Sequence, residues 1–328
     1  MKMLVISHSQ VKNLLPMDEC IDIMAETLTA LARGQAFQPL RMTVRPPEAA
    51  GIMVVMPSYM AGAHPAYGLK AVCVFPGNPA KGKDAHQGTV MIFSAETGEP
   101  KAVMNASAIT AIRTAAVSGV ATRLLARPDA ADLAIIGAGV QARPHLEAIT
   151  CVRPIQRVRV ADCDFNRARA FVDEMRTSVS ATIEIAKNIE LAVREADVIV
   201  TVTTSREPVL KREWIAPGAH INAVGASMPT TREIDTETIK AASLFVDRRE
   251  STLNESGDYL LAMREGAIGP DHIKAEIGEV LTGAKPGRTS DGEITVFKSL
   301  GLAVEDLASA EYIFRKAQQA GIGAWVEF

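Results

Sequence analysis

The spacing of hydrophobic positions changes twice along the first part of the chain. Residues 17–33 place apolar side chains three or four positions apart and are followed by Gly34, which predicts an amphipathic helix that ends there. From residue 40 to residue 93 the chain has short β-rich runs separated by Pro and Gly clusters, which predicts a meandering sheet. An alanine-rich stretch over residues 107–126, ended by Arg127-Pro128, predicts a long helix.

Beyond Pro128, short and almost wholly apolar strands alternate with helices. This alternation is typical of a parallel sheet covered on both faces, so we predict an α/β protein with a Rossmann-type doubly wound sheet. The tail from Thr295 carries a long helical pattern without an evident strand partner, and we expect it to pack on the N-terminal part. The predicted domains are an N-terminal α/β domain over residues 1–113, joined by a C-terminal helix over 305–328, and a doubly wound domain over 114–304.

The composition narrows the class of function. The chain has 328 residues, 48% hydrophobic and 22% charged, with a net charge of -3, so it lacks the basic field that holds nucleic acid or an anionic membrane. Its four cysteines have no metal-ligand spacing, its first residues lack the apolar run of a signal peptide, and no stretch approaches a membrane helix. We therefore predict a cytoplasmic enzyme with a small-molecule substrate, no metal, no nucleic-acid partner and no membrane.

A glycine fingerprint lies between a predicted strand and a predicted helix. The strand LAII runs into Gly137-Ala138-Gly139-Val140-Gln141-Ala142, which has the form GxGxxA. Gly137 permits a tight turn, Gly139 lets the backbone approach a pyrophosphate, and Ala142 lets the helix pack closely on its strand. Because the helix N-terminus also offers free N–H groups, this motif predicts a dinucleotide site.

An acid follows the second strand of the predicted parallel sheet. Asp162 lies 25 residues after Gly137, near the position at which a carboxylate accepts hydrogen bonds from a ribose 2′-hydroxyl. It would repel a 2′-phosphate, and Cys163 supplies no positive charge to offset this. We therefore predict NAD(H), with NADP(H) as the alternative because Arg167 is near enough to weaken the preference. A solvated carboxylate at the strand end is the alternative interpretation of Asp162.

Three cations in the N-terminal part are candidates for substrate binding. Lys70 lies inside an apolar strand pattern, where a lone ammonium is rare and needs an anionic partner. Arg113 lies in an otherwise uncharged stretch, and Arg41 lies at the start of a predicted strand. Two guanidiniums and an ammonium in one place would bind a carboxylate. For each cation alone, an ordinary surface or salt-bridged group remains the alternative.

Several segments, in order, resemble the ornithine cyclodeaminase/μ-crystallin family. They cover almost the whole chain and include RMTV, MPSY, GLKAV, TAIRTAAVSGVATRLLA, IIGAGVQA, GAHINAVGASMP, NESGD and TVFKSLGLAVEDLASA. The resemblance implies an NAD(P)-dependent homodimer, with an N-terminal domain that binds substrate and dimerises through its sheet, and a Rossmann domain that binds the dinucleotide.

The resemblance also implies roles for individual residues. Lys70 and Arg113 are the predicted catalytic residues, and they bind substrate together with Arg41, while Glu255 borders the substrate pocket. The predicted cofactor-binding positions are His86, Thr114, Gly137, Gly139, Val140, Gln141, Asp162, Thr203, Val224, Ser227 and Ser299.

Two departures separate this chain from the cyclodeaminase branch. That branch has a catalytic Asp where this chain has Ser227, and a Glu that meets the distal amine of a diamino acid where this chain has Val54. The motifs GAS and FKSLG are instead similar to the μ-crystallin, or ketimine reductase, branch. That branch has an Asn-Arg pair where this chain has Asp162-Cys163, so its cofactor preference is not transferred.

Together these observations predict an oxidoreductase that reduces the C=N bond of a small cyclic imino acid, such as Δ1-pyrroline-2-carboxylate or Δ1-piperideine-2-carboxylate, to the L-amino acid. An ornithine cyclodeaminase with recycled NAD, reductive amination of the alanine dehydrogenase kind, and a non-enzymatic NAD(H)-binding protein are the alternatives. His220 is a weaker candidate for a general acid, since a histidine at a strand entrance is more often a core group, and His145 is weaker still.

Overall fold

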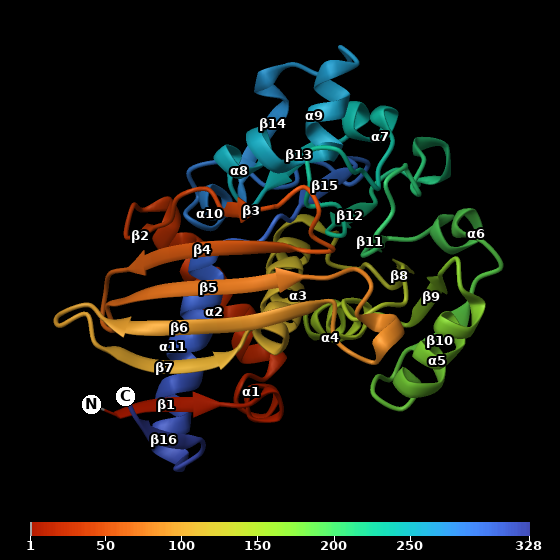
Figure 1. Cartoon of the computed structure of the whole chain (residues 1–328). Coiled ribbons are helices and arrows are strands. Elements are labelled where there is room, and N and C mark those ends of the chain that lie inside the picture. Colours follow the sequence, from red (N-terminus) through yellow and green to blue (C-terminus); the bar gives the residue numbers. More distant parts are fainter. Residues whose placement is uncertain (1) are drawn as a thin grey trace. The chain divides into compact units, whose positions relative to one another are not determined.

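The computed structural model describes residues 2–328, which divide into two compact units (Figure 1). Unit 1 contains the residues up to Thr114 together with Gly301–Phe328, and unit 2 contains Ala115–Leu300. Unit 1 is therefore built from both ends of the chain, whereas unit 2 is one continuous segment. Thr114 and residues 301–304, which we expected in the second domain, belong to unit 1.

Unit 1 contains a mixed sheet with the strand order β16-β1-β7-β6-β5-β4-β2, and β3 also pairs with β4. The parallel pair is β1 with β7, and the other pairs are antiparallel. The central strands β4 to β7 form the predicted meander. The strands are β1 (Lys2–Ile6), β2 (Ala36–Phe37), β3 (Met42–Val44), β4 (Ile52–Met60), β5 (Ala66–Val74), β6 (His86–Ser94), β7 (Pro100–Asn105) and β16 (Ala324–Glu327).

Helices cover one face of this sheet. They are α1 (His8–Leu14), α2 (Met17–Ala32), the start of α3 (Ala106–Leu125) and α11 (Ala303–Ala320), which contacts β4, β5, β6 and α2 (Figure 1). Helix α2 buries Ile21, Met24 and Leu28 at helical spacing, as predicted. A Cβ at Gly68 of β5 would lie only 2.9 Å from a methyl carbon of Leu307, so glycine is needed for α11 to pack this closely.

Unit 2 has an all-parallel sheet with the strand order β10-β9-β8-β11-β12-β15-β13-β14. Its strands are β8 (Asp132–Ile136), β9 (Arg157–Ala161), β10 (Thr182–Ile185), β11 (Val198–Thr201), β12 (His220–Ala223), β13 (Ser243–Val246), β14 (Ile273–Glu276) and β15 (Thr295–Lys298). Its helices are the rest of α3, α4 (Ala142–Val152), α5 (Phe165–Met175), α6 (Ile189–Val193), α7 (Thr236–Ala241), α8 (Arg249–Glu255), α9 (Gly257–Arg264) and α10 (Ile277–Leu281).

The strands of unit 2 bury side chains on both faces of the sheet. Along β8, Ala134 and Ile136 belong to one apolar core, and Leu133 and Ile135 belong to the other. Two cores separated by one parallel sheet confirm the predicted doubly wound fold. The strand order reverses between β8 and β11, which is where ligands bind in folds of this kind.

The structure corrects the predicted tail. The helix expected over residues 305–328 begins at Ala303 and ends at Ala320, where Gly321 takes a left-handed φ of 66°, and residues 324–327 pair with β1 as an edge strand. Thr295–Lys298, at the start of this tail, forms strand β15 and pairs with both β12 and β13. Both strands are short and are held by partners distant in the sequence, so no local pattern indicates them.

Other predictions concern the cysteines, metal ligands and membrane helices. Cys20, Cys73, Cys151 and Cys163 are free thiols, and residues 2–328 contain no group of His, Cys, Asp and Glu side chains able to hold a metal ion. Within the same range, α3 is the one helix long and apolar enough to cross a membrane, and 72% of that stretch is buried. The buried core helix of a soluble protein can be equally long and apolar, so α3 is weak evidence for a membrane span.

Candidate active site

Lys70 lies on the covered face of the unit 1 sheet. Along β5, Ala66, Gly68, Lys70 and Val72 alternate with more exposed residues, so the strand period turns Lys70 toward α11. Its side chain is only 4% exposed, and a buried ammonium is costly without a counter-charge. An anionic partner is therefore expected for this side chain.

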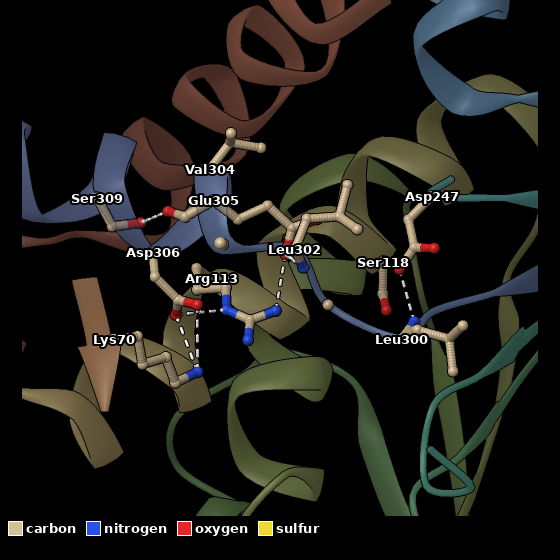
Figure 2. A network of polar contacts seen from close by, with 12 residues as sticks. Lys70, Arg113, Ser118, Asp247, Leu300, Leu302, Val304, Glu305, Asp306 and Ser309 are labelled. Carbon is tan, nitrogen blue, oxygen red and sulfur yellow. Dashed lines mark hydrogen bonds and ion pairs between the residues drawn. The ribbon is translucent and has the colours of Figure 1, made fainter. Parts of the chain in front are cut away.

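The first turn of α11 supplies that partner (Figure 2). Lys70 Nζ donates to Asp306 Oδ1 at 3.1 Å and to Oδ2 at 3.2 Å. Arg113 Nε donates to the same Asp306 Oδ1 at 3.0 Å, and Arg113 Nη1 donates to Glu305 Oε2 at 2.7 Å. All four side chains are at most 5% exposed. We call Lys70, Arg113, Glu305 and Asp306 the buried charge cluster.

Arg41 lies beside the buried charge cluster. It precedes β3, and its Nη2 donates to the carbonyl oxygen of Gly301 at 3.1 Å. Gly301 has a left-handed φ of 79°, and a Cβ there would lie 2.4 Å from Arg113 Nη1, so only glycine fits. The glycine of the FKSLG motif therefore lies between the two arginines, and the structure brings the three predicted cations together in unit 1.

Burial lowers the pKa of Lys70 to about 8, from an ordinary value of 10.5. The positive charges of Arg113 and Arg41 contribute to this lowering, whereas the carboxylate of Asp306 opposes it. Such an amine is mostly protonated at neutral pH yet releases its proton readily. Lys70 can therefore act as a general acid.

The other predicted residues near the substrate and nucleotide fall in different places. His86 begins β6, and desolvation, followed by the charge of Lys70, lowers its pKa. Thr114 is buried in α3. Glu255 ends α8 in unit 2, so it belongs to a different unit from the buried charge cluster.

The glycine loop of unit 2 has the predicted context of strand, turn and helix. Gly137 follows β8 with φ of 98°, and a Cβ there would lie 2.8 Å from the carbonyl oxygen of Val202. A Cβ at Gly139 would meet nothing within 4 Å, so this side of the turn is open. Gly139, Val140 and Gln141 directly precede α4. Within residues 2–328 their N–H groups have no hydrogen-bond acceptor, as is usual at a helix N-terminus. Three such donors at a helix N-terminus fit a pyrophosphate.

Asp162 is tied to this loop. Its Oδ2 accepts from the N–H of Ala138 at 2.7 Å, its Oδ1 accepts from the N–H of Asp164 at 2.8 Å, and Arg167 Nη1 lies 3.9 Å from Oδ1. The side chain is 4% exposed, so it is not the solvated carboxylate considered as an alternative. It holds the glycine turn in shape at the position expected for the ribose-binding acid.

The remaining predicted cofactor residues follow the carboxyl ends of neighbouring parallel strands. Thr203 lies two residues beyond β11, Val224 and Ser227 follow β12, and Ser299 follows β15. Parallel strands end at the same edge of a sheet, and β8 lies next to β11, so these residues share that edge with the glycine loop.

A buried polar network that the sequence pattern did not predict shapes this edge. Glu233 is fully buried; its Oε1 accepts from the N–H of Thr203 at 2.7 Å, and its Oε2 accepts from the N–H of Gly225 at 2.6 Å. Asp258 accepts from the N–H of Glu233 at 2.8 Å and pairs with Lys298 Nζ at 2.9 Å. Lys298, like Lys70, is a lone ammonium within an apolar strand pattern, TVFK, and such a group needs a buried anionic partner.

The two histidines belong to the core of unit 2. His220 begins β12 at the opposite edge of the sheet from the glycine loop, and its Nδ1 lies 2.9 Å from Thr295 Oγ1. Burial, followed by the charge of Arg288, lowers the pKa of His220 to about 3, so its ring is uncharged near neutral pH. His145 contacts Ser118 Oγ at 3.0 Å, and burial lowers its pKa to about 4. Neither histidine is a general acid.

These features define a class of protein: a two-unit α/β protein with a dinucleotide-type glycine loop in a Rossmann sheet and a separate cluster of buried cations and carboxylates. Comparison with known protein families identifies the family: residues 1–321 match the ornithine cyclodeaminase/mu-crystallin family. The chain belongs to this family, which confirms the resemblance found in the sequence.

Known members of the family include reductases. The chain is 44% identical over 281 residues to ketimine reductase mu-crystallin of Mus musculus, covering 86% of this chain and 85% of that protein. The structure of Δ1-pyrroline-2-carboxylate reductase of Thermococcus litoralis, in complex with NADH and L-proline, matches with a TM-score of 0.96 and 40% identity, covering 98% and 99% of the two chains. An archaeal alanine dehydrogenase dimer with bound NAD matches with a TM-score of 0.94 and 36% identity over the whole of both chains.

Proposed function

We propose that this protein is an NADH-dependent reductase of small cyclic imino acids, such as Δ1-pyrroline-2-carboxylate or Δ1-piperideine-2-carboxylate, and forms the L-amino acid. The observation that carries the proposal is the buried Lys70 ammonium, paired with Asp306 at 3.1 Å and lying beside Arg41 and Arg113. This arrangement combines a proton donor with positive charge for a carboxylate. The similarity to reductases of this kind supports the same substrate class.

The residues of unit 1 bind the substrate and supply the proton. Arg41 and Arg113 bind its carboxylate. The ion pairs with Glu305 and Asp306 fix the orientation of the Arg113 guanidinium. Lys70 Nζ gives its proton to the imine nitrogen, which makes the imine carbon a better acceptor of hydride. The neutral Lys70 amine then regains a proton from solvent.

The residues of unit 2 bind the dinucleotide. The N–H groups of Gly139, Val140 and Gln141 receive the pyrophosphate, and Asp162 accepts hydrogen bonds from the ribose hydroxyls. NADH, when bound, supplies the hydride that reduces the imine carbon. Asp162 disfavours a 2′-phosphate by charge repulsion, which supports NADH over NADPH.

The alternative of a cyclodeaminase is disfavoured at two positions. Val54 is buried in an apolar cluster with Met56, Val72 and Ala303, so it offers no charge to the distal amine of a diamino acid. Ser227 stands where the resemblance expects the catalytic carboxylate. Reductive amination of a keto acid would use the same cations and is the second candidate, because an archaeal alanine dehydrogenase matches over the whole chain.

We also propose that the protein is a cytoplasmic homodimer that pairs through the uncovered face of the unit 1 sheet. Tyr59 and Tyr67 lie on this face with ring centroids 4.8 Å apart, and Tyr67 is 52% exposed. Exposed apolar side chains gathered on one sheet face are typical of a protein interface. Light scattering measures the mass, and Tyr67→Lys is expected to shift the protein toward monomer.

The free thiols support a reducing compartment such as the cytoplasm.

The test of the proposed activity follows NADH absorbance with the purified protein and a panel of substrates. The panel contains the two cyclic imino acids, pyruvate with ammonia, and pyruvate with methylamine, and chiral chromatography identifies the product. Turnover of a cyclic imino acid well above the keto acid mixtures supports the proposal. Preferred turnover of pyruvate with ammonia would favour reductive amination, and NADH binding without any turnover would favour a binding protein.

A further inference from the structure

The first turn of α11 is fixed firmly on the sheet that carries Lys70. Ser58 Oγ on β4 donates to the carbonyl oxygen of Ala303 at 3.2 Å, and the N–H of Val304 donates to Gln38 Oε1 at 2.9 Å. These contacts hold the backbone just before Asp306. Both carboxylate oxygens of Asp306 then meet the Lys70 ammonium, which places Nζ between two acceptors (Figure 2).

We propose that Asp306 is the positioning residue of the proposed reaction: it orients the Lys70 ammonium and supplies the counter-charge that Lys70 needs to donate its proton to the imine nitrogen. This inference rests on the proposed function. Asp306 acts through Lys70 and is assigned no contact with the substrate.

The other charged groups around Lys70 cannot replace Asp306. Arg113 on α3, Arg41 before β3 and His86 on β6 are cationic or neutral, and the two arginines both disfavour a charged Lys70. Glu305 is the other nearby carboxylate, but its Oε2 accepts from Arg113 at 2.7 Å and from the N–H of Leu302 at 3.1 Å. Without Asp306, burial and the arginines would act on Lys70 unopposed, and the amine would lose its proton near neutral pH.

The first experiment measures kcat against pH for the wild type and Asp306→Asn. In the wild type, kcat should fall as the pH rises through about 8, because Lys70 loses its proton there. In Asp306→Asn this fall should move to lower pH by about one to three units, and kcat at neutral pH should drop on the order of tenfold or more. Glu311→Gln is the matched control, since Glu311 lies on the same helix and pairs with Lys101. An unshifted profile in Asp306→Asn overturns the proposal.

A double-mutant cycle separates action through Lys70 from a merely structural role. Asp306→Asn should lower kcat strongly in the wild type but have little effect in the Lys70→Met background. An equal loss in both backgrounds means that Asp306 does not act through Lys70. If Asp306→Asn does not fold, Asp306→Glu keeps the charge but moves the carboxylate by one methylene. In Asp306→Glu, kcat should fall while the pH profile stays in place. A wild-type kcat in this variant would refute the positioning role.

A substrate-independent measurement distinguishes failure of this inference from failure of the proposed function. In protein labelled with ¹³C at the lysine Cε, the Lys70 signal is assigned by its loss in Lys70→Met and is then titrated. Asp306→Asn should lower the pH at which this signal titrates, whether or not any imino acid is reduced. An unchanged titration overturns the inference even in a protein that proves to be a reductase.

Discussion

Replacement of Lys70 by methionine should chiefly lower kcat. Methionine keeps most of the bulk of the side chain but removes the proton and the charge needed as hydride arrives. With a pKa of about 8, roughly nine-tenths of the Lys70 side chains carry the proton at pH 7. Nearly every wild-type molecule therefore has its proton donor in the charged form. Loss of a positioned general acid predicts a fall in kcat of about 10²–10⁴.

Replacement of Arg41 by alanine should act differently. The guanidinium contacts the substrate carboxylate in both the ground state and the transition state, so Arg41→Ala should mainly raise KM, by about 1.5–3 kcal/mol of binding free energy. This corresponds to a factor of about 10–150. The contrast between a kcat effect at one cation and a KM effect at its neighbour distinguishes the two roles.

The assay is steady-state kinetics with a cyclic imino acid, with NADH binding measured separately by fluorescence. Both variants should bind NADH as the wild type does, because neither side chain belongs to the glycine loop. Lys101→Met is a matched control, since Lys101 lies in the same sheet, is 29% exposed and pairs with Glu311. If Lys70→Met retains the wild-type kcat, Lys70 is only a structural cation and the reasoning fails.

Three further predictions concern the cofactor, the branch of the family and the buried network. NADH should exceed NADPH in kcat/KM, and Asp162→Ser combined with Cys163→Arg should reverse the order; a tenfold preference of the wild type for NADPH, about 1.4 kcal/mol, would contradict this. Incubation with L-ornithine and NAD should yield no proline above background because Ser227 and Val54 are not carboxylates, and enzymatic formation of proline and ammonia would show the branch assignment to be wrong. Glu233→Gln should weaken NADH binding and lower unfolding stability by about 1–3 kcal/mol, because a neutral amide cannot accept from all the backbone N–H groups that Glu233 holds; calorimetry and thermal melting would measure this, and wild-type values of both would refute the role.

The parts of the fold with strong local patterns could be predicted from the sequence. The alternation of apolar strands and helices predicted the doubly wound sheet, and its cores on both faces confirm that interpretation. The helical spacing of Ile21, Met24 and Leu28 predicted α2 correctly. In these segments the residues that determine each element lie within a few positions of one another.

The missed features depend on partners far away in the chain. Strand β16 is only four residues long and exposed along its whole length, and its pairing with β1 is what identifies it as a strand. Glu305 and Asp306 lie in the first turn of α11, where acidic side chains are common, but their partners Arg113 and Lys70 lie more than 190 residues earlier. No local pattern specifies which of 38 acidic residues will meet a given buried lysine.

The division of the chain has a consequence for how the protein is made. Because a chain emerges from the ribosome from its N-terminus, the strand carrying Lys70 is synthesised first, then all of unit 2, and α11 with Asp306 last. Unit 2 is one continuous segment and can form while synthesis continues. The sheet of unit 1 still lacks α11 during this time, so the face that α11 later covers is exposed and the Lys70 ammonium is in water. Interrupted synthesis before residue 303 would therefore leave unit 2 complete and unit 1 without α11 and β16.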